Sequence, residues 1–291
     1  MKLVTFSIHG ALKIGVWTDE GVLDLSSCGV DLPGDMLTLI QMGDTGLDQV
    51  RTAIEKGGDI LSVDAIKLVQ PILRPPKILA IALNYAEHVK ESVTEKPAVQ
   101  MWFNKQSTCV TGPFSPIDLP KVSDKLDYEG ELGVVIGKRC RHVPRERASE
   151  VIFGYTVIND VSVRDWQRAA QTFQIGKSFD THGPFGPYIV TPDEVDNPQN
   201  LHIRTLVNNE VRQDSNTKHM IYKIDEQIAH LTTAFTLEPG DVLATGTPSG
   251  VGAAMNPPNF LKEGDICRVE IEQVGAIENK VVKETGDTVI Q

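Results

Sequence analysis

Apolar and polar residues alternate in two short runs near the start of the chain, residues 3–8 (LVTFSI) and 12–17 (LKIGVW), which HGA separates. This spacing predicts a hairpin of two strands, and GVLDL at 21–25 predicts a third. Residues 36–57 then carry apolar side chains at helical spacing, which predicts a helical segment. The first part of the chain is therefore expected to form a small α+β unit.

A proline-rich stretch, PILRPPK at 71–77, separates this unit from the rest of the chain. Proline fixes the backbone and removes a hydrogen-bond donor, so such a stretch is typical of a boundary between domains. We therefore expect a small N-terminal domain over residues 1–70 and a larger domain over residues 71–291.

The larger domain is dominated by predicted strands. KILAIAL (77–83) has the composition of a buried strand, NYAEHVKES (84–92) predicts a short helix or an ordered loop, and VNNEV (207–211) predicts a hairpin. Two helical patterns interrupt the strands, at residues 163–170 and 224–235. Because strands and helices do not alternate, we expect an α+β fold that is mainly β rather than a doubly wound βαβ fold.

Composition and charge narrow the class of protein. The chain has 291 residues, of which 41% are hydrophobic and 23% charged, and its formal net charge is −11. This charge argues against a nucleic-acid partner, which requires a basic surface. No apolar run approaches the length of a membrane span. The apolar stretch in the first ten residues, MKLVTFSIHG, is too short for a signal peptide. The four scattered cysteines predict reduced thiols, so we expect an intracellular enzyme without a membrane partner.

Three carboxylates stand at the ends of predicted strands. Glu129 and Glu131 lie two residues apart in DYEGELGVVIG (127–137), so a strand directs both to one face. Asp160 ends a second apolar run, FGYTVIND. Such an all-oxygen set suits Mg²⁺ or Mn²⁺. The alternative is the solvent face of a half-buried sheet, but LGVVIG predicts a strand buried on both faces, where unpaired acids are costly.

His88 and Glu91 lie three residues apart, so a helix places them on one face. A carboxylate beside an imidazole fixes its tautomer and strengthens it as a base, which is how such pairs activate water. The alternative, favoured by this segment alone, is a surface helix whose charges face solvent.

Residues 159–187 carry many polar groups around few apolar ones. Lys177 is either a solvated loop lysine or, near a metal and a carboxylate substrate, a group that stabilises negative charge. Arg164 is either a partner of Asp165 or a pocket residue, as Gln167 is, whereas His182 is expected to pack in a loop.

A glycine-rich segment, ATGTPSGVG (244–252), follows a predicted strand. Its glycines allow close backbone approach, and its hydroxyls, among them Thr247, offer donors to an anion. The segment lacks the lysine and spacing of a nucleotide-binding loop, so we reject nucleotide binding. A plain turn is the alternative. The chain has no G-x-S-x-G motif, which disfavours an α/β-hydrolase, and no cysteine in a recognisable nucleophile context, which disfavours a cysteine hydrolase.

Taken together, these segments resemble the fumarylacetoacetate hydrolase family. The resemblance covers about residues 72–283 and rests on the order and spacing of several motifs. These are NYAEHVKE, DYEGELGVVIGK, GYTVINDVSVRDWQ, GKSFDTHGPFGPYIV, VNNEVRQ and PGDVLATGTPSGVG. The resemblance implies a mixed β-roll of packed sheets, with a small N-terminal domain and a catalytic domain over 71–291. It also implies a homodimer, located in the cytoplasm or, for a eukaryotic chain, in the mitochondrial matrix.

The resemblance also implies roles for individual residues. The metal ligands for Mg²⁺ or Mn²⁺ are Glu129, Glu131 and Asp160. The catalytic residues are His88 and Glu91, which activate water from a lid segment, and Lys177. The residues that contact substrate are Arg164, Gln167 and Thr247.

Members of this family act on 2-oxo acids, so the resemblance implies that class of substrate. Our leading hypothesis is hydrolysis of a C–C bond in a 1,3-diketo acid of the acylpyruvate type, through a metal-bound enolate. The alternatives are decarboxylation of oxaloacetate and keto–enol tautomerisation or isomerisation at the same site. A carboxylate-binding module without catalysis is a further alternative, disfavoured by the completeness of the residue set.

Overall fold

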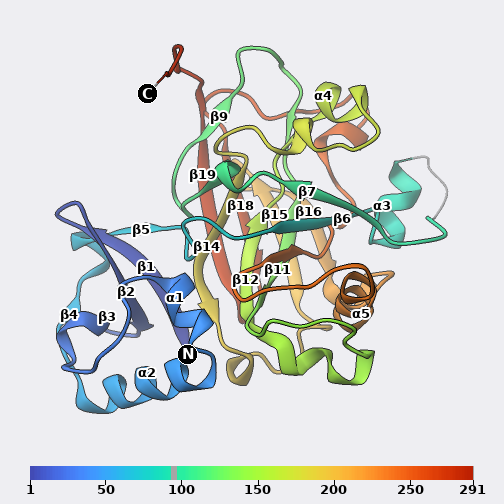
Figure 1. Ribbon diagram of the computed structural model, residues 1–291. Helices are drawn as coiled ribbons and strands as arrows, with labels where there is room; N and C mark the ends of the chain where they lie inside the picture. The colour runs from blue at the N-terminus through green and yellow to red at the C-terminus, as the bar shows by residue number, and fades with distance from the viewer. Residues whose placement is uncertain (93–96, 291) are drawn as a thin grey trace.

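A twelve-stranded sheet forms the frame of the computed structural model, which describes residues 1–92 and 97–290 (Figure 1). Its strands follow the order β4, β3, β2, β1, β14, β12, β11, β17, β6, β7, and β5 and β8 pair with β1 and β14. Their bounds are β1 Lys2–Ile8, β2 Ala11–Thr18, β3 Gly21–Asp24, β4 Ile60–Leu61, β5 Lys67–Val69, β6 Ile78–Ala82, β7 Met101–Lys105, β8 Val110–Thr111, β11 Gly130–Ile136, β12 Ile152–Asn159, β14 Gly183–Val190 and β17 Val242–Ala244.

A five-stranded sheet and a two-stranded sheet complete the β-structure of the described residues. The first has the order β16, β15, β18, β19, β9, and the second pairs β10 with β13. Their bounds are β9 Ile117–Leu119, β10 Leu126–Asp127, β13 Ser162–Val163, β15 His202–Val207, β16 Glu210–Asn216, β18 Ile266–Ile271 and β19 Gly275–Lys283. The α+β fold that the sequence predicts, dominated by strands, is confirmed.

Five α-helices accompany the sheets in the described residues. They are α1 Met36–Gln41, α2 Asp44–Lys56, α3 Ala86–Glu91, α4 Arg164–Ala169 and α5 Ile224–Ala234. The sequence predicted helical structure in the segments of α1, α2, α4 and α5, and for the segment of α3 it left open a short helix or an ordered loop, of which the structure has the helix. Among residues 1–92 and 97–290, no helix combines the length and the apolar character that a membrane crossing needs.

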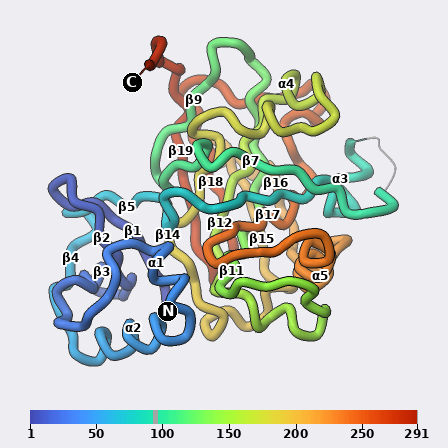
Figure 2. The backbone as a smooth tube through the Cα atoms, in the orientation of Figure 1, coloured from blue at the N-terminus to red at the C-terminus, as the bar shows by residue number. Residues whose placement is uncertain are grey.

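The N-terminal elements gather on one side of the molecule, where they are drawn in blue (Figure 2). They are not separate from the larger sheet, because β1 pairs antiparallel with β14, with Leu3 opposite Ile189. A domain boundary at residue 70 stays a prediction.

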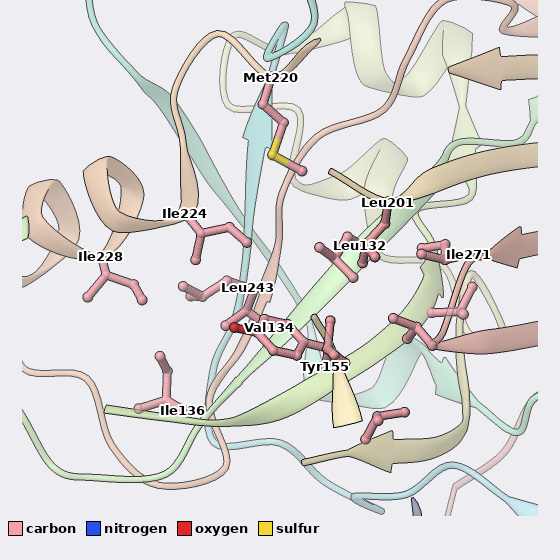
Figure 3. Close-up of a cluster of buried hydrophobic side chains, with 14 of the residues drawn as sticks. Leu132, Val134, Ile136, Tyr155, Leu201, Met220, Ile224, Ile228, Leu243 and Ile271 are labelled. Carbon is pink, nitrogen blue, oxygen red and sulfur yellow. The ribbon is translucent and has the colours of Figure 1, made fainter. Parts of the chain in front are cut away.

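Strand β11 lies at the centre of the larger sheet and is buried along its whole length. Leu132, Val134 and Ile136 enter one apolar cluster together with Tyr155 and residues of α5 (Figure 3). Val135 faces the other way and joins a second cluster. The prediction of a strand buried on both faces is therefore confirmed, and β11 is a rigid base for the acidic residues at its start.

Candidate active site

The three predicted carboxylates meet at the junction of β11 and β12. Glu129 directly precedes β11, Glu131 is its second residue, and Asp160 directly follows β12. The two strands are antiparallel with Gly130 opposite Asn159, so the start of one lies beside the end of the other. One oxygen from each carboxylate lies within 4.8 Å of the others, and all three side chains are buried.

The electrostatics of this cluster favour a bound cation. Burial, together with the charges of Asp160 and Glu129, raises the pKa of Glu131 well above its ordinary value. Burial would also raise the pKa of Glu129, but the charges of Lys177 and Arg164 outweigh it and lower that pKa to about 2. Three buried carboxyl oxygens at this spacing form a hard donor set, so the residues fit Mg²⁺ or Mn²⁺.

Two buried lysines flank the cluster. The Lys177 ammonium lies 2.6 Å from Glu129 Oε2 and 2.8 Å from Asp160 Oδ2, and it also lies 5.2 Å from the centre of the Phe103 ring. Lys105, the last residue of β7, lies 2.7 Å from Asp160 Oδ1. Lys177 was predicted here, whereas Lys105 was not. Its signal in the sequence was the alternation of β7, which places it on the same face as Phe103.

Lys105 is expected to position Asp160 for metal binding. We expect Lys105→Met to weaken Mg²⁺ binding by about 10- to 100-fold, as loss of a group that orients a ligand does elsewhere. Lys105→Arg should restore part of the affinity, because it keeps a hydrogen-bond donor that can orient Asp160. Calorimetric titration of the folded variants measures this, and an unchanged dissociation constant in Lys105→Met would exclude the positioning role.

Arg164 does not pair with its neighbour Asp165, one of the alternatives left open by the sequence. Its Nε donates to Asp127 Oδ2 at 2.8 Å, and its Nη1 lies 2.6 Å from Glu129 Oε1 and 3.0 Å from Gln167 Oε1. Asp127 also accepts the backbone N–H groups of Gly252 and Ala253, at 2.8 and 2.9 Å. Asp127, which was not predicted as a site residue, therefore ties α4 to the glycine-rich segment.

His88 and Glu91 form a hydrogen-bonded pair on α3. His88 Nδ1 lies 2.6 Å from Glu91 Oε1, and Glu91 Oε2 accepts the N–H of Gly250 at 2.8 Å. Because an ionised carboxylate can only accept, Nδ1 carries the proton and Nε2 is the free basic nitrogen. The pair is mostly buried, with side chains 9% and 20% exposed, so the surface-helix alternative is wrong for His88.

The glycine-rich segment is shaped by close contacts. Gly250 has φ +104°, and a Cβ there would lie 1.9 Å from the carbonyl oxygen of Arg212, so only glycine fits. The Thr247 hydroxyl donates its single proton to Gly130 O at 3.0 Å and accepts from Gln213 Nε2 at 2.8 Å. A substrate carboxylate reaching Thr247 would therefore have to displace the bond to Gly130 or use the backbone N–H of Thr247.

These elements surround one cavity of about 480 Å³. Its walls contain seven of the nine predicted site residues: His88, Glu91, Glu129, Arg164, Gln167, Lys177 and Thr247. Glu131 and Asp160 lie beside Glu129 in the carboxylate cluster. The rest of the wall includes apolar side chains such as Phe103, Phe173 and Val251. The structure thus brings together residues that the sequence separates by more than 150 positions.

His182 packs in a loop, as the sequence predicted. Its ring stacks on Phe179 with centroids 5.4 Å apart, and Nε2 lies 2.8 Å from the Asp118 carbonyl oxygen. Burial lowers the pKa of His182 from 6.5 to about 4, with the nearby charge of Lys105 acting in the same direction.

Acid should therefore destabilise the fold partly through His182. Because its folded-state pKa lies below the unfolded value, its contribution is complete above about pH 6.5 and is lost as the pH falls towards 4. Between pH 7 and pH 5 we expect this group alone to cost about 2 kcal/mol of stability. Chemical denaturation at the two pH values should show a smaller loss in His182→Gln. An equal loss in both proteins would contradict the assignment.

Three comparisons place the chain among known proteins. It is 41% identical to a mitochondrial oxaloacetate tautomerase of Xenopus laevis, over 97% of this chain and 90% of the relative. A fumarylacetoacetate hydrolase structure from Exiguobacterium antarcticum superposes with a TM-score of 0.84 at 35% identity, covering 98% of this chain and all of that one. A maleylpyruvate hydrolase from Sphingobium sp. SYK-6, in complex with manganese(II) and pyruvate, gives 0.83 at 30% identity with the same coverage.

The family assignment agrees with the site. Residues 77–282 match the family described as Fumarylacetoacetate (FAA) hydrolase C-terminal, and this range contains every predicted site residue. The resemblance drawn from the sequence motifs is therefore confirmed, and this chain belongs to the fumarylacetoacetate hydrolase family.

Proposed function

We propose that this chain is a divalent-cation-dependent enzyme of 2-oxo acids, and that its reaction is the keto–enol tautomerisation of oxaloacetate. The observation that carries the proposal is a buried carboxylate cluster beside a cavity that also holds a histidine–glutamate pair. The 41% identity to an oxaloacetate tautomerase, over nearly the whole of both chains, supports this reaction over the hydrolysis favoured by the sequence motifs alone.

Glu129, Glu131 and Asp160 would hold the cation. When bound, a divalent cation supplies Lewis-acid polarisation of the carboxylate and keto oxygens of a 2-oxo acid. The manganese in the related maleylpyruvate hydrolase structure supports a divalent ion, with either Mg²⁺ or Mn²⁺ compatible with this donor set.

The side chains of the cavity supply the proton transfer. In tautomerisation the C3–H bond of oxaloacetate breaks, a C2–C3 double bond forms, and the C2 oxygen takes up a proton. His88 Nε2 would accept the C3 proton, while Glu91 holds the opposite ring nitrogen and stabilises the imidazolium. Lys177 would stabilise the negative charge that develops on the C2 oxygen. Transfer of this proton from His88 to the C2 oxygen completes the tautomerisation and returns the enzyme to its starting protonation state.

Hydrolysis of an acylpyruvate is a second candidate. It would use the same residues, with His88 Nε2 taking a proton from water that attacks the distal carbonyl carbon. The similarity to a maleylpyruvate hydrolase favours this reaction. The cavity volume of about 480 Å³ is also large enough for substrates larger than a four-carbon acid. The homodimer and the location expected from the family resemblance stay predictions.

One assay separates these reactions. Purified protein loaded with Mg²⁺ is given oxaloacetate, acetylpyruvate or fumarylpyruvate in parallel, and enol absorbance, released pyruvate and released CO₂ are measured. We expect accelerated keto–enol exchange of oxaloacetate that disappears after chelation. Pyruvate release from acylpyruvates alone would favour hydrolysis, and CO₂ release from oxaloacetate would favour decarboxylation. Absence of all three activities would refute the proposed function.

A further inference from the structure

We propose that helix α4 carries a second carboxylate subsite, formed by Arg168 and the free Nη2 of Arg164, that selects dicarboxylic 2-oxo acids. The inference rests on the proposed function, because it assumes a 2-oxo acid in the cavity. It adds the residue that recognises the far end of the substrate.

One face of α4 forms part of the cavity wall. Arg164, Gln167 and Arg168 are three and four residues apart, so a helix places them side by side. All three contribute to the cavity wall. The helix lies at one end of the molecule, above the strands that carry the carboxylate cluster (Figure 1).

The Nη2 group of Arg164 is free to bind a ligand. Its Nε and Nη1 are held by Asp127, Glu129 and Gln167, whereas Nη2 is buried and has no partner among residues 1–92 and 97–290. A buried donor without an acceptor is costly, more so when it belongs to a charged group. Since the side chain is only 7% exposed and lines the cavity, an anionic oxygen bound there would satisfy Nη2.

Arg168 is a positively charged residue in the same cavity wall that is available to bind an anion. Its side chain is exposed, and within residues 1–92 and 97–290 it makes no ion pair. Arg74 shares this property, but it does not line the cavity. An exposed guanidinium at the edge of a substrate cavity can bind a carboxylate through two parallel N–H groups without breaking a structural contact.

The charges of the site favour a positive side chain, such as Arg168, opposite a second substrate carboxylate. Four buried acids (Asp127, Glu129, Glu131 and Asp160) and the partly buried Glu91 face three buried bases (Lys105, Arg164 and Lys177), which leaves two negative charges when all are ionised and His88 is neutral. A divalent cation neutralises these two charges, so each substrate carboxylate adds one negative charge to the site. A second carboxylate would therefore be unbalanced in a partly buried site, at a substantial cost, unless Arg168 faced it.

The test compares ligands that differ only in the second carboxylate. Tautomerisation is measured with oxaloacetate and with its 4-methyl ester. Binding is measured by calorimetry with malate and lactate, stable 2-hydroxy acids with and without the second carboxylate. The variants are Arg168→Gln, Arg168→Lys and, as a matched control, Arg74→Gln.

We expect Arg168→Gln to lower kcat/KM for oxaloacetate about 10-fold relative to the ester, and to weaken malate binding by a similar factor relative to lactate. The loss should lie mainly in KM, Arg168→Lys should recover part of it, and Arg74→Gln should leave both ratios unchanged. Unchanged ratios in Arg168→Gln, or equal losses for both ligands of a pair, would overturn the subsite. If the wild-type protein converts neither oxaloacetate nor its ester, the proposed function fails, while the malate and lactate titrations still decide the subsite.

Discussion

Replacing Glu131 by glutamine is expected to weaken divalent-cation binding at least about 100-fold and to remove turnover of 2-oxo acids. Loss of groups that merely orient a ligand costs about 10- to 100-fold in affinity, so loss of a ligand charge should cost no less. Glutamine keeps the shape of the side chain, and its carbonyl oxygen can still accept the N–H of Gly246, which lies 2.7 Å from Glu131 Oε2. The fold should therefore survive the change.

Of the three carboxylates, Glu131 is the one whose replacement disturbs the fewest other interactions. Glu129 and Asp160 each form ion pairs with a buried lysine, so their substitution would also leave a buried cation without its partner. For Glu131 within the described residues, no such ion pair is found. Cation binding is measured by calorimetry and turnover with oxaloacetate, with Glu278→Gln as a surface control. A Glu131→Gln protein that binds Mg²⁺ and turns over normally would contradict the metal assignment.

Substitution of His88 by glutamine should lower kcat by about 10²- to 10⁴-fold, the usual contribution of a positioned acid–base group. Cation affinity should stay within about twofold of wild type, because His88 is not among the three carboxylate ligands. Glu91→Gln should have a smaller effect, since it leaves the imidazole in place and removes only its orienting partner.

The control for His88 is His230→Gln, which changes an exposed histidine on α5. Its kcat should match that of the wild-type protein. If His88→Gln retained full kcat for oxaloacetate while binding Mg²⁺, the base would have to be another group in the cavity, and the histidine–glutamate pair would leave the mechanism.

The acidic cluster was predictable because it depends on local pattern. Alternation along DYEGELGVVIG puts Glu129 and Glu131 on one face, and the apolar run after them indicates burial. Their meeting with Asp160 required that two predicted strands be adjacent and antiparallel. The sequence does not state that pairing, and the family resemblance supplied it.

The supporting residues were harder to predict because their partners are distant in sequence. Asp127 contacts Arg164, 37 positions later, and backbone groups more than 120 positions later. Lys105 contacts Asp160 across 55 positions. Lysine and aspartate are usually exposed, so local sequence favours a solvated role for both. Only the tertiary fold shows that they are buried and paired.

Strand pairing also determined how the N-terminal part is attached. Its hairpin and helices follow from hydrophobic spacing, but the pairing of β1 with β14 joins residues almost 190 positions apart. Nothing in the first seventy residues indicates that contact, so a proline-rich stretch alone could not establish whether the unit stands apart.

The most direct measurement is anomalous scattering from a crystal of the protein soaked in Mn²⁺ and a 2-oxo acid. We expect a single strong peak among the carboxyl oxygens of Glu129, Glu131 and Asp160, with the keto acid in the cavity beside it. A crystal without a peak there, or with the ion held elsewhere while the enzyme remains active, would show that these three carboxylates do not hold the catalytic cation.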